Sequence, residues 1–122
     1  MPRSISTADG RDALGAVRAA SDSGSAPARA DLATAVRYLL QLLVEKAPGH
    51  SVEVRVPPFG AVQVVEGPRH TRGTPPNVVE MDAQTWIALA TGTQEWSDAA
   101  AAGLISASGV RADVSDLLPL RP

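Results

Sequence analysis

The most constraining feature of the sequence is a change of hydrophobic period at Ala47–Pro48–Gly49. Before this point, apolar residues recur at spacings of three and four, which predicts an amphipathic helix with an N-cap at Asp31 and an apolar face of Leu32, Val36, Leu39, Leu40 and Leu43. After it, valines at every second position predict a strand over 52–56, which Pro57–Gly60 connects to a second strand over 61–66. A helix followed by an antiparallel hairpin indicates a mixed α/β domain.

The remaining segments predict shorter elements on both sides of this unit. We expect a first helix within Ser4–Ala20, capped by Thr7 or Asp9, and a linker at Ser21–Pro27. After the hairpin, the sequence predicts a strand at 77–81, a helix capped by Asp82 and ending at Gly92, and an alanine-rich helix capped by Ser97 and ending at Gly103. A short strand around 104–107 and a closing turn around 114–118, ended by Pro119, complete the expected order.

Length and charge narrow the class of protein. A chain of 122 residues is the size of one domain, so we expect a single domain over 1–122, with an N-terminal helix and linker at 1–27 and a core at 28–122. The 11 basic and 13 acidic residues are interspersed, which argues against nucleic acid as a partner. No apolar run is long enough for an integral membrane span and the N-terminus lacks a secretion signal, so we expect a cytoplasmic protein.

Motifs for the common catalytic chemistries are absent from the sequence. There are no cysteines, no Gly-x-Ser-x-Gly elbow, no phosphate-binding glycine loop and no His-Glu-x-x-His pair. Asp31, Asp82 and Asp98 stand at candidate helix starts, where carboxylates commonly cap helices, and a catalytic pair of carboxylates brought together by the fold is the alternative. We therefore expect a non-enzymatic protein with no catalytic residues, no metal and no cofactor.

Two features point to ligand binding instead, although each also has an ordinary structural explanation. Arg69, His70 and Arg72 lie in a loop rich in glycine and proline, where they would form either a solvated rim or a polar mouth that grips the head of a ligand. Trp86 and Trp96 are half of the four aromatic residues, and they would either pack in the core or line an apolar pocket.

The run from Thr85 to Ala99, continued by Gly103–Gly109, closely resembles the C-terminal signature of the sterol carrier protein 2 family: an apolar helix, an alanine helix and a short strand, each ending in glycine. Residues 55–63 and 69–80 resemble the short, stand-alone bacterial branch of that family found in actinobacteria. The resemblance implies an α+β fold in which helices cover a curved, mainly antiparallel sheet of about four or five strands. It also implies a hydrophobic tunnel for fatty acyl chains, sterols or similar lipids.

Together these observations predict non-catalytic binding or carriage of an apolar or amphipathic small molecule. The expected pocket lies between the Leu32–Leu43 helix, the hairpin and the Trp86 helix, lined by Leu39, Leu43, Val62, Val64, Trp86, Leu89, Trp96 and Ile105. Two alternatives remain: a partner or accessory domain of an enzyme, as in mycothiol-dependent isomerases, and a ligand-free scaffold for protein interaction, a homodimer included.

Overall fold

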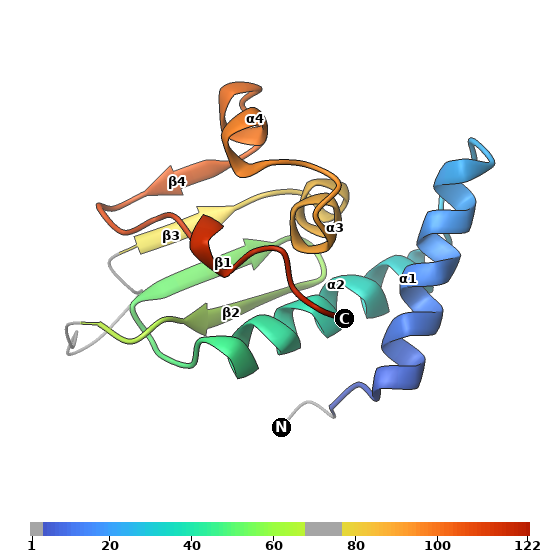
Figure 1. Ribbon diagram of the computed structural model, residues 1–122, viewed down its shortest axis with the longest axis horizontal. Coiled ribbons are helices and arrows are strands. Elements are labelled where there is room, and N and C mark those ends of the chain that lie inside the picture. The colour runs from blue at the N-terminus through green and yellow to red at the C-terminus, as the bar shows by residue number, and fades with distance from the viewer. Residues whose placement is uncertain (1–3, 68–76) are drawn as a thin grey trace.

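The computed structural model describes residues 4–67 and 77–122. Within these residues the elements follow the order α1 (Thr7–Asp22), α2 (Arg29–Lys46), β1 (Val52–Val56), β2 (Gly60–Val64), β3 (Asn77–Glu80), α3 (Ala83–Thr91), α4 (Trp96–Ala101), β4 (Ser106–Ser108) and a 3₁₀ turn, η1 (Ser115–Leu117). Helices and strands form one α+β arrangement (Figure 1), as the sequence predicts.

The strands form a four-stranded sheet in the order β2-β1-β3-β4. Two of its pairings are antiparallel: β1 with β2 places Val54 opposite Val62, and β3 with β4 places Val79 opposite Ala107. This confirms a mainly antiparallel sheet, but β1 and β3 are parallel, with Val54 opposite Val79. β3 lies on the other side of β1 from β2 and runs in the direction of β1.

The two faces of the sheet differ in polarity because side chains alternate along each strand. On β1, Val52, Val54 and Val56 are buried and belong to the same core cluster as residues of α2 and α3. Glu53 and Arg55 lie on the opposite face, where the Arg55 guanidinium donates to the Glu53 carboxylate. This hydrogen bond raises the pKa of Arg55. The helices therefore cover one face, and the other presents charged side chains.

Trp86 joins α3 to α2 at the centre of the core. Its side chain is fully buried, and its Nε1 donates to the Val36 carbonyl oxygen at 3.3 Å. The apolar face of α2 supplies Leu39 and Leu43, both also fully buried. A large aromatic ring thus sits in a core that is otherwise mainly aliphatic, and its polar N–H has a partner, as buried indoles require.

Some predicted helix ends are confirmed and others are wrong. Asp82 caps α3 as predicted, its side chain accepting from the Thr85 amide at 2.8 Å, and Gly92 ends the helix with φ of 84°. The N-caps predicted at Thr7 or Asp9, at Asp31 and at Ser97 are wrong, because the helices start after Ser6, Ala28 and Glu95. Neither Ala28 nor Glu95 makes a side-chain cap bond, so no capping pattern marks those starts.

Several strand boundaries also differ from the prediction by one or two residues, and two of these differences have a backbone cause. The second strand ends at Val64 because Val65 has a positive φ of 68°, which leaves the extended conformation. The last strand starts at Ser106 because the Leu104 amide still bonds to the Ala99 carbonyl at the end of α4. Both differences come from single residues whose backbone is set by a neighbouring element.

Helix α1 packs across α2, away from the strands (Figure 1). The contact is closest at Gly10, where a Cβ would lie 2.3 Å from Cγ of the buried Tyr38 ring. The Gln41 side chain bonds to both backbone groups of Ile5, accepting from its amide at 2.9 Å and donating to its carbonyl at 3.0 Å. None of the helices in the described segments is long and apolar enough to cross a membrane.

Candidate functional site

The eight predicted pocket residues lie in or against one apolar cluster. Five are buried within it: Leu39, Leu43, Val64, Trp86 and Leu89. The other three are partly buried and pack against it: Val62, Trp96 and Ile105. The structure thus brings the predicted set together, with the first group packed inside and the second at the boundary with solvent. The predicted polar mouth, Arg69, His70 and Arg72, lies outside the described residues.

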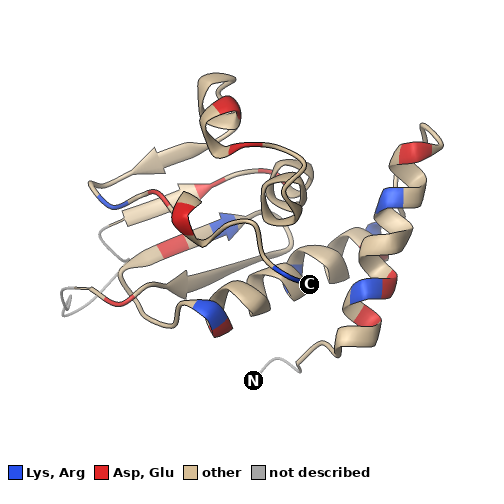
Figure 2. Cartoon of the chain, in the orientation of Figure 1, with Lys and Arg blue, Asp and Glu red and all other residues tan. Residues whose placement is uncertain are grey.

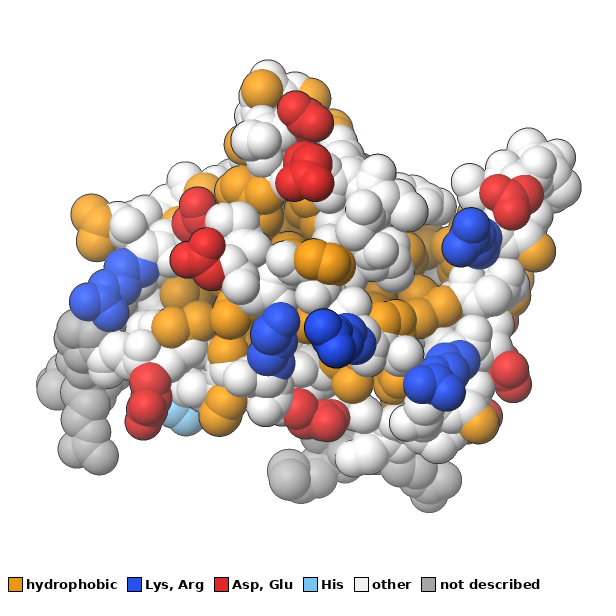
Figure 3. Space-filling view, in the orientation of Figure 1, with side chains coloured by type: hydrophobic (Ala, Val, Ile, Leu, Met, Phe, Trp, Pro, Cys, Tyr) orange, Lys and Arg blue, Asp and Glu red, His pale blue; other side chains and the backbone are white. Residues whose placement is uncertain are grey.

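Two of these residues, Leu89 and Trp96, also line a small pocket, here called the α3–α4 crevice. Its volume is about 170 Å³, and its wall consists of Leu89, Gly92, Gln94, Glu95, Trp96, Ser115, Leu118 and Pro119. Figure 3 shows hydrophobic side chains gathered beneath the projecting α4 on this side of the molecule. The crevice links a core leucine to a half-buried tryptophan, so it is where the apolar interior meets solvent.

The first wall of the crevice is set by the end of α3. Gly92 takes the left-handed conformation, and the next amide, that of Thr93, turns back to the Ala88 carbonyl at 2.9 Å. This turn directs the chain into α4 and brings Trp96 beside Leu89. Gly92, which the sequence predicts as the end of this helix, therefore also determines where Trp96 lies in the crevice.

The second wall is the C-terminal segment, which lies along α3. The Leu120 amide donates to the Ala90 carbonyl at 2.8 Å, and Lys46 Nζ at the end of α2 donates to the Leu117 carbonyl at 2.7 Å. Between these two anchors, Leu118 and Pro119 face the crevice. Sequence reasoning missed both residues as part of a site, because their spacing indicates only a closing turn.

The crevice combines apolar walls with a polar rim. Leu89, Trp96 and Leu118 give it apolar walls, whereas Gln94, Glu95 and Ser115 place polar groups at its rim. Small-molecule sites are commonly lined in this way, by apolar side chains with a few polar groups. Among the described residues, no three His, Cys, Asp or Glu side chains converge as a metal site.

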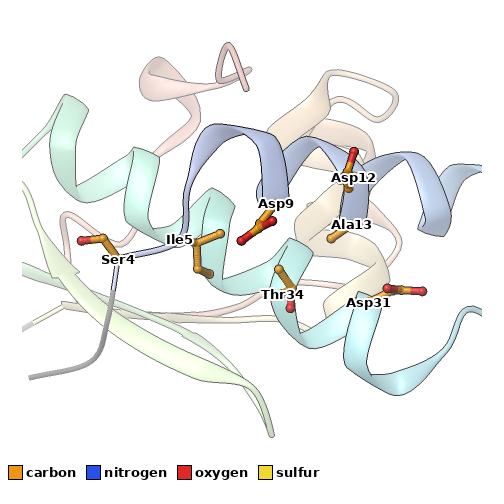
Figure 4. Close-up of a pocket in the computed structure, with 7 residues that line it drawn as sticks. All are labelled: Ser4, Ile5, Asp9, Asp12, Ala13, Asp31 and Thr34. Carbon is orange, nitrogen blue, oxygen red and sulfur yellow. The ribbon is translucent and has the colours of Figure 1, made fainter.

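A second pocket, of about 430 Å³, lies between the N-terminal parts of α1 and α2 (Figure 4) and is lined by Ser4, Ile5, Asp9, Asp12, Ala13, Asp31 and Thr34. It is a wide groove with more solvent contact than the crevice. Figure 4 shows Asp9 directed toward α2, with Asp12 and Asp31 pointing away from one another. The carboxylates do not converge on a common point. An apolar chain bound in this groove would exclude water from them, which is unfavourable for charged groups without partners.

Comparison with models of known protein families shows to which family the chain belongs. A family model described as "Bacterial SCP ortholog" matches residues 28–120. The chain belongs to this family. The bacterial SCP match begins just before α2, so it includes the sheet, most of the core and both walls of the crevice, whereas α1, which adds Ala13 and Val17 to the core, precedes it. A comparison with curated proteins finds no match.

Proposed function

We propose that this bacterial SCP protein binds and carries an apolar or amphipathic small molecule, such as a fatty acyl or sterol-like lipid, without catalysing a reaction. The observation that carries the proposal is the α3–α4 crevice, where Trp96 and Leu118 give an external group access to the core residue Leu89. Membership of the bacterial SCP family supports a lipid-binding role in general.

The dimensions of the crevice limit how the ligand would bind. A volume of about 170 Å³ is below the roughly 300 Å³ at which small-molecule pockets begin, so the crevice accepts one end of a lipid rather than all of it. Burying about five methylenes there contributes about 4 kcal/mol before the cost of association is subtracted, so the crevice alone supports a dissociation constant of about 1 mM at best. Tighter binding requires the chain to enter the core cluster by displacing Leu118 or other wall residues.

The polar rim would hold the head of the ligand in water. Gln94 and Ser115 offer hydrogen bonds to a hydroxyl or carboxyl group at the crevice entrance. A further grip by Arg69, His70 and Arg72 stays a prediction, as do a cytoplasmic location and a role as an enzyme's partner.

The test uses Trp96 as the reporter in a Trp86→Phe background, so that fluorescence comes from the crevice alone. We expect a medium-chain fatty acid to shift the Trp96 emission in this protein. Leu118→Glu places a charge on the apolar wall and should weaken binding at least tenfold, whereas Ala19→Glu on the exposed side of α1 serves as the charge-matched control. Equal titrations for the two variants would overturn the proposed site.

A further inference from the structure

The rim of the α3–α4 crevice carries a carboxylate and no basic group. Among the residues that line the crevice, Glu95 is acidic, Gln94 and Ser115 are neutral and polar, and none is basic. Glu95 stands at the N-cap position of α4 but makes no cap bond, and the one ion pair among residues 4–67 and 77–122 joins Arg55 to Glu53. The Glu95 carboxylate therefore lies at the entrance without a partner in the described chain.

Three aspartates add negative charge on both sides of this entrance. Asp98 lies in the first turn of α4, three residues beyond Glu95, so these two carboxylates also offset the positive end of the helix dipole. On the other wall, Asp113 accepts from the Ser115 amide at 2.8 Å, and Asp116 follows that serine directly. Figure 2 shows acidic positions on α4 and around η1, and in Figure 3 acidic side chains flank the hydrophobic ones between these segments.

Basic side chains next to the two walls do not line the crevice. Lys46 Nζ donates to the Leu117 carbonyl at 2.7 Å. Arg111 lies with Nη1 against Gly67, 3.0 Å from the position that a Cβ would take there. Arg121 is exposed, beyond the end of the C-terminal wall. The groups that a ligand meets at the entrance are therefore negative or neutral.

Trp96 gives the same entrance a second preference for a cation. Its side chain is half-buried and lines the crevice next to Glu95. Ammonium groups are attracted to the face of an aromatic ring, and most strongly to that of tryptophan. A protonated amine at the rim can contact this ring and donate its three N–H groups to oxygens of Glu95, Gln94 and Ser115. A carboxylate in the same place is repelled by Glu95 and gains no such contact from the ring.

We propose that the α3–α4 crevice selects amphiphiles with an ammonium head over those with a carboxylate head of the same chain length. The inference rests on the proposed function, in which an apolar tail binds against Leu89, and it adds the charge of the head. Glu95 and Trp96 determine the choice by contact, and the three aspartates attract cations over a longer range. A fatty acid still binds through its tail, but more weakly than the matching amine.

The test compares three heads on one tail: octylamine, octanol and octanoate, which at pH 7 are positive, neutral and negative. Amide chemical shifts of residues 89–96 and 115–118 in ¹⁵N-labelled protein report binding at the crevice and serve for every variant. At low salt, octylamine should bind about tenfold more tightly than octanoate, with octanol between them, the combined effect of one exposed ion pair and one exposed cation–π contact. Because salt screens exposed charges, the ratio should fall to about threefold in about 0.5 M NaCl.

Two variants assign the selectivity to the crevice. Glu95→Gln and Trp96→Leu should each lower the ratio of octylamine to octanoate affinity about threefold. Asp22→Asn removes a carboxylate from the end of α1, which does not line the crevice, and should leave the ratio unchanged. Equal binding of octylamine and octanoate, or a preference that survives both crevice variants, would overturn the selectivity and leave tail binding standing. If none of the three ligands shifts the crevice amides, the proposed function fails and this inference fails with it.

Discussion

Two glycines in α1 give a matched test of how this helix packs. At Gly10 a Cβ would lie 2.3–2.5 Å from three ring carbons of Tyr38, whereas at Gly15 nothing lies within 4 Å of it. Both positions are inside Thr7–Asp22, so Ala replaces Gly in the same helical backbone. Each substitution gains about 0.5–1 kcal/mol from helix propensity, and only the first meets a neighbouring ring.

The size of the difference follows from the Tyr38 ring. It is only 2% exposed and so has little room to move, and overpacking of this kind typically costs about 1–3 kcal/mol. Gly15→Ala should therefore raise the free energy of unfolding by about 0.5–1 kcal/mol, and Gly10→Ala should lower it by about 1–2 kcal/mol.

Urea denaturation followed by far-ultraviolet circular dichroism measures both variants, and amide exchange of α1 shows whether the loss is local. Because detachment of α1 is one response to the overlap, Gly10→Ala should increase exchange in 7–22 before it does so in the sheet. If Gly10→Ala is as stable as Gly15→Ala, with α1 equally protected, the described packing of α1 on α2 is wrong.

Two further pairs of substitutions test the segments around the sheet and the crevice. Asn77→Ala removes the donor to the buried Ser51 carbonyl and the acceptor for the partly buried Arg111 amide, and should cost about 2–3 kcal/mol in urea unfolding. The exposed Ser108→Ala should cost less than about 0.5 kcal/mol, and equal costs would contradict this role. Gly92→Ala and Gly103→Ala both force alanine into a positive φ, at about 1–2 kcal/mol each, but only at Gly92 would the Cβ meet Pro119, at 3.3 Å. Thermal unfolding should show Gly92→Ala to be the less stable of the pair, and the reverse order would argue against a close C-terminal wall.

The sequence predicts the elements well where one physical signal acts alone. Alternating valines predict β1, and the four residues that follow predict the hairpin that places Val54 opposite Val62. Asp82 caps α3 and Gly92 ends it, because both signals depend on local backbone geometry. The helix starts at Arg29 and Trp96 have no side-chain cap, so packing of the helix rather than a local signal determines where they begin.

Strand order and the shape of the crevice depend on long-range packing and were not predictable in this way. The parallel pairing of β1 and β3 follows from where the chain crosses after β2, which no periodicity reveals. The crevice needs Leu118 beside Leu89, and that contact depends on the backbone bond from Leu120 to Ala90. The apolar residues could thus be assigned to a common core, but not the point at which that core opens to solvent.

The central claim, that the crevice admits an apolar chain, is tested most directly by the affinity for fatty acids of increasing length. Native mass spectrometry should show one lipid per chain, and Trp96 fluorescence in the Trp86→Phe protein should show binding that tightens about fourfold per added methylene, the equivalent of about 0.8 kcal/mol. This increase should continue until the apolar space is filled. An affinity independent of chain length, or the absence of a one-to-one complex with any lipid in the series, would contradict the account.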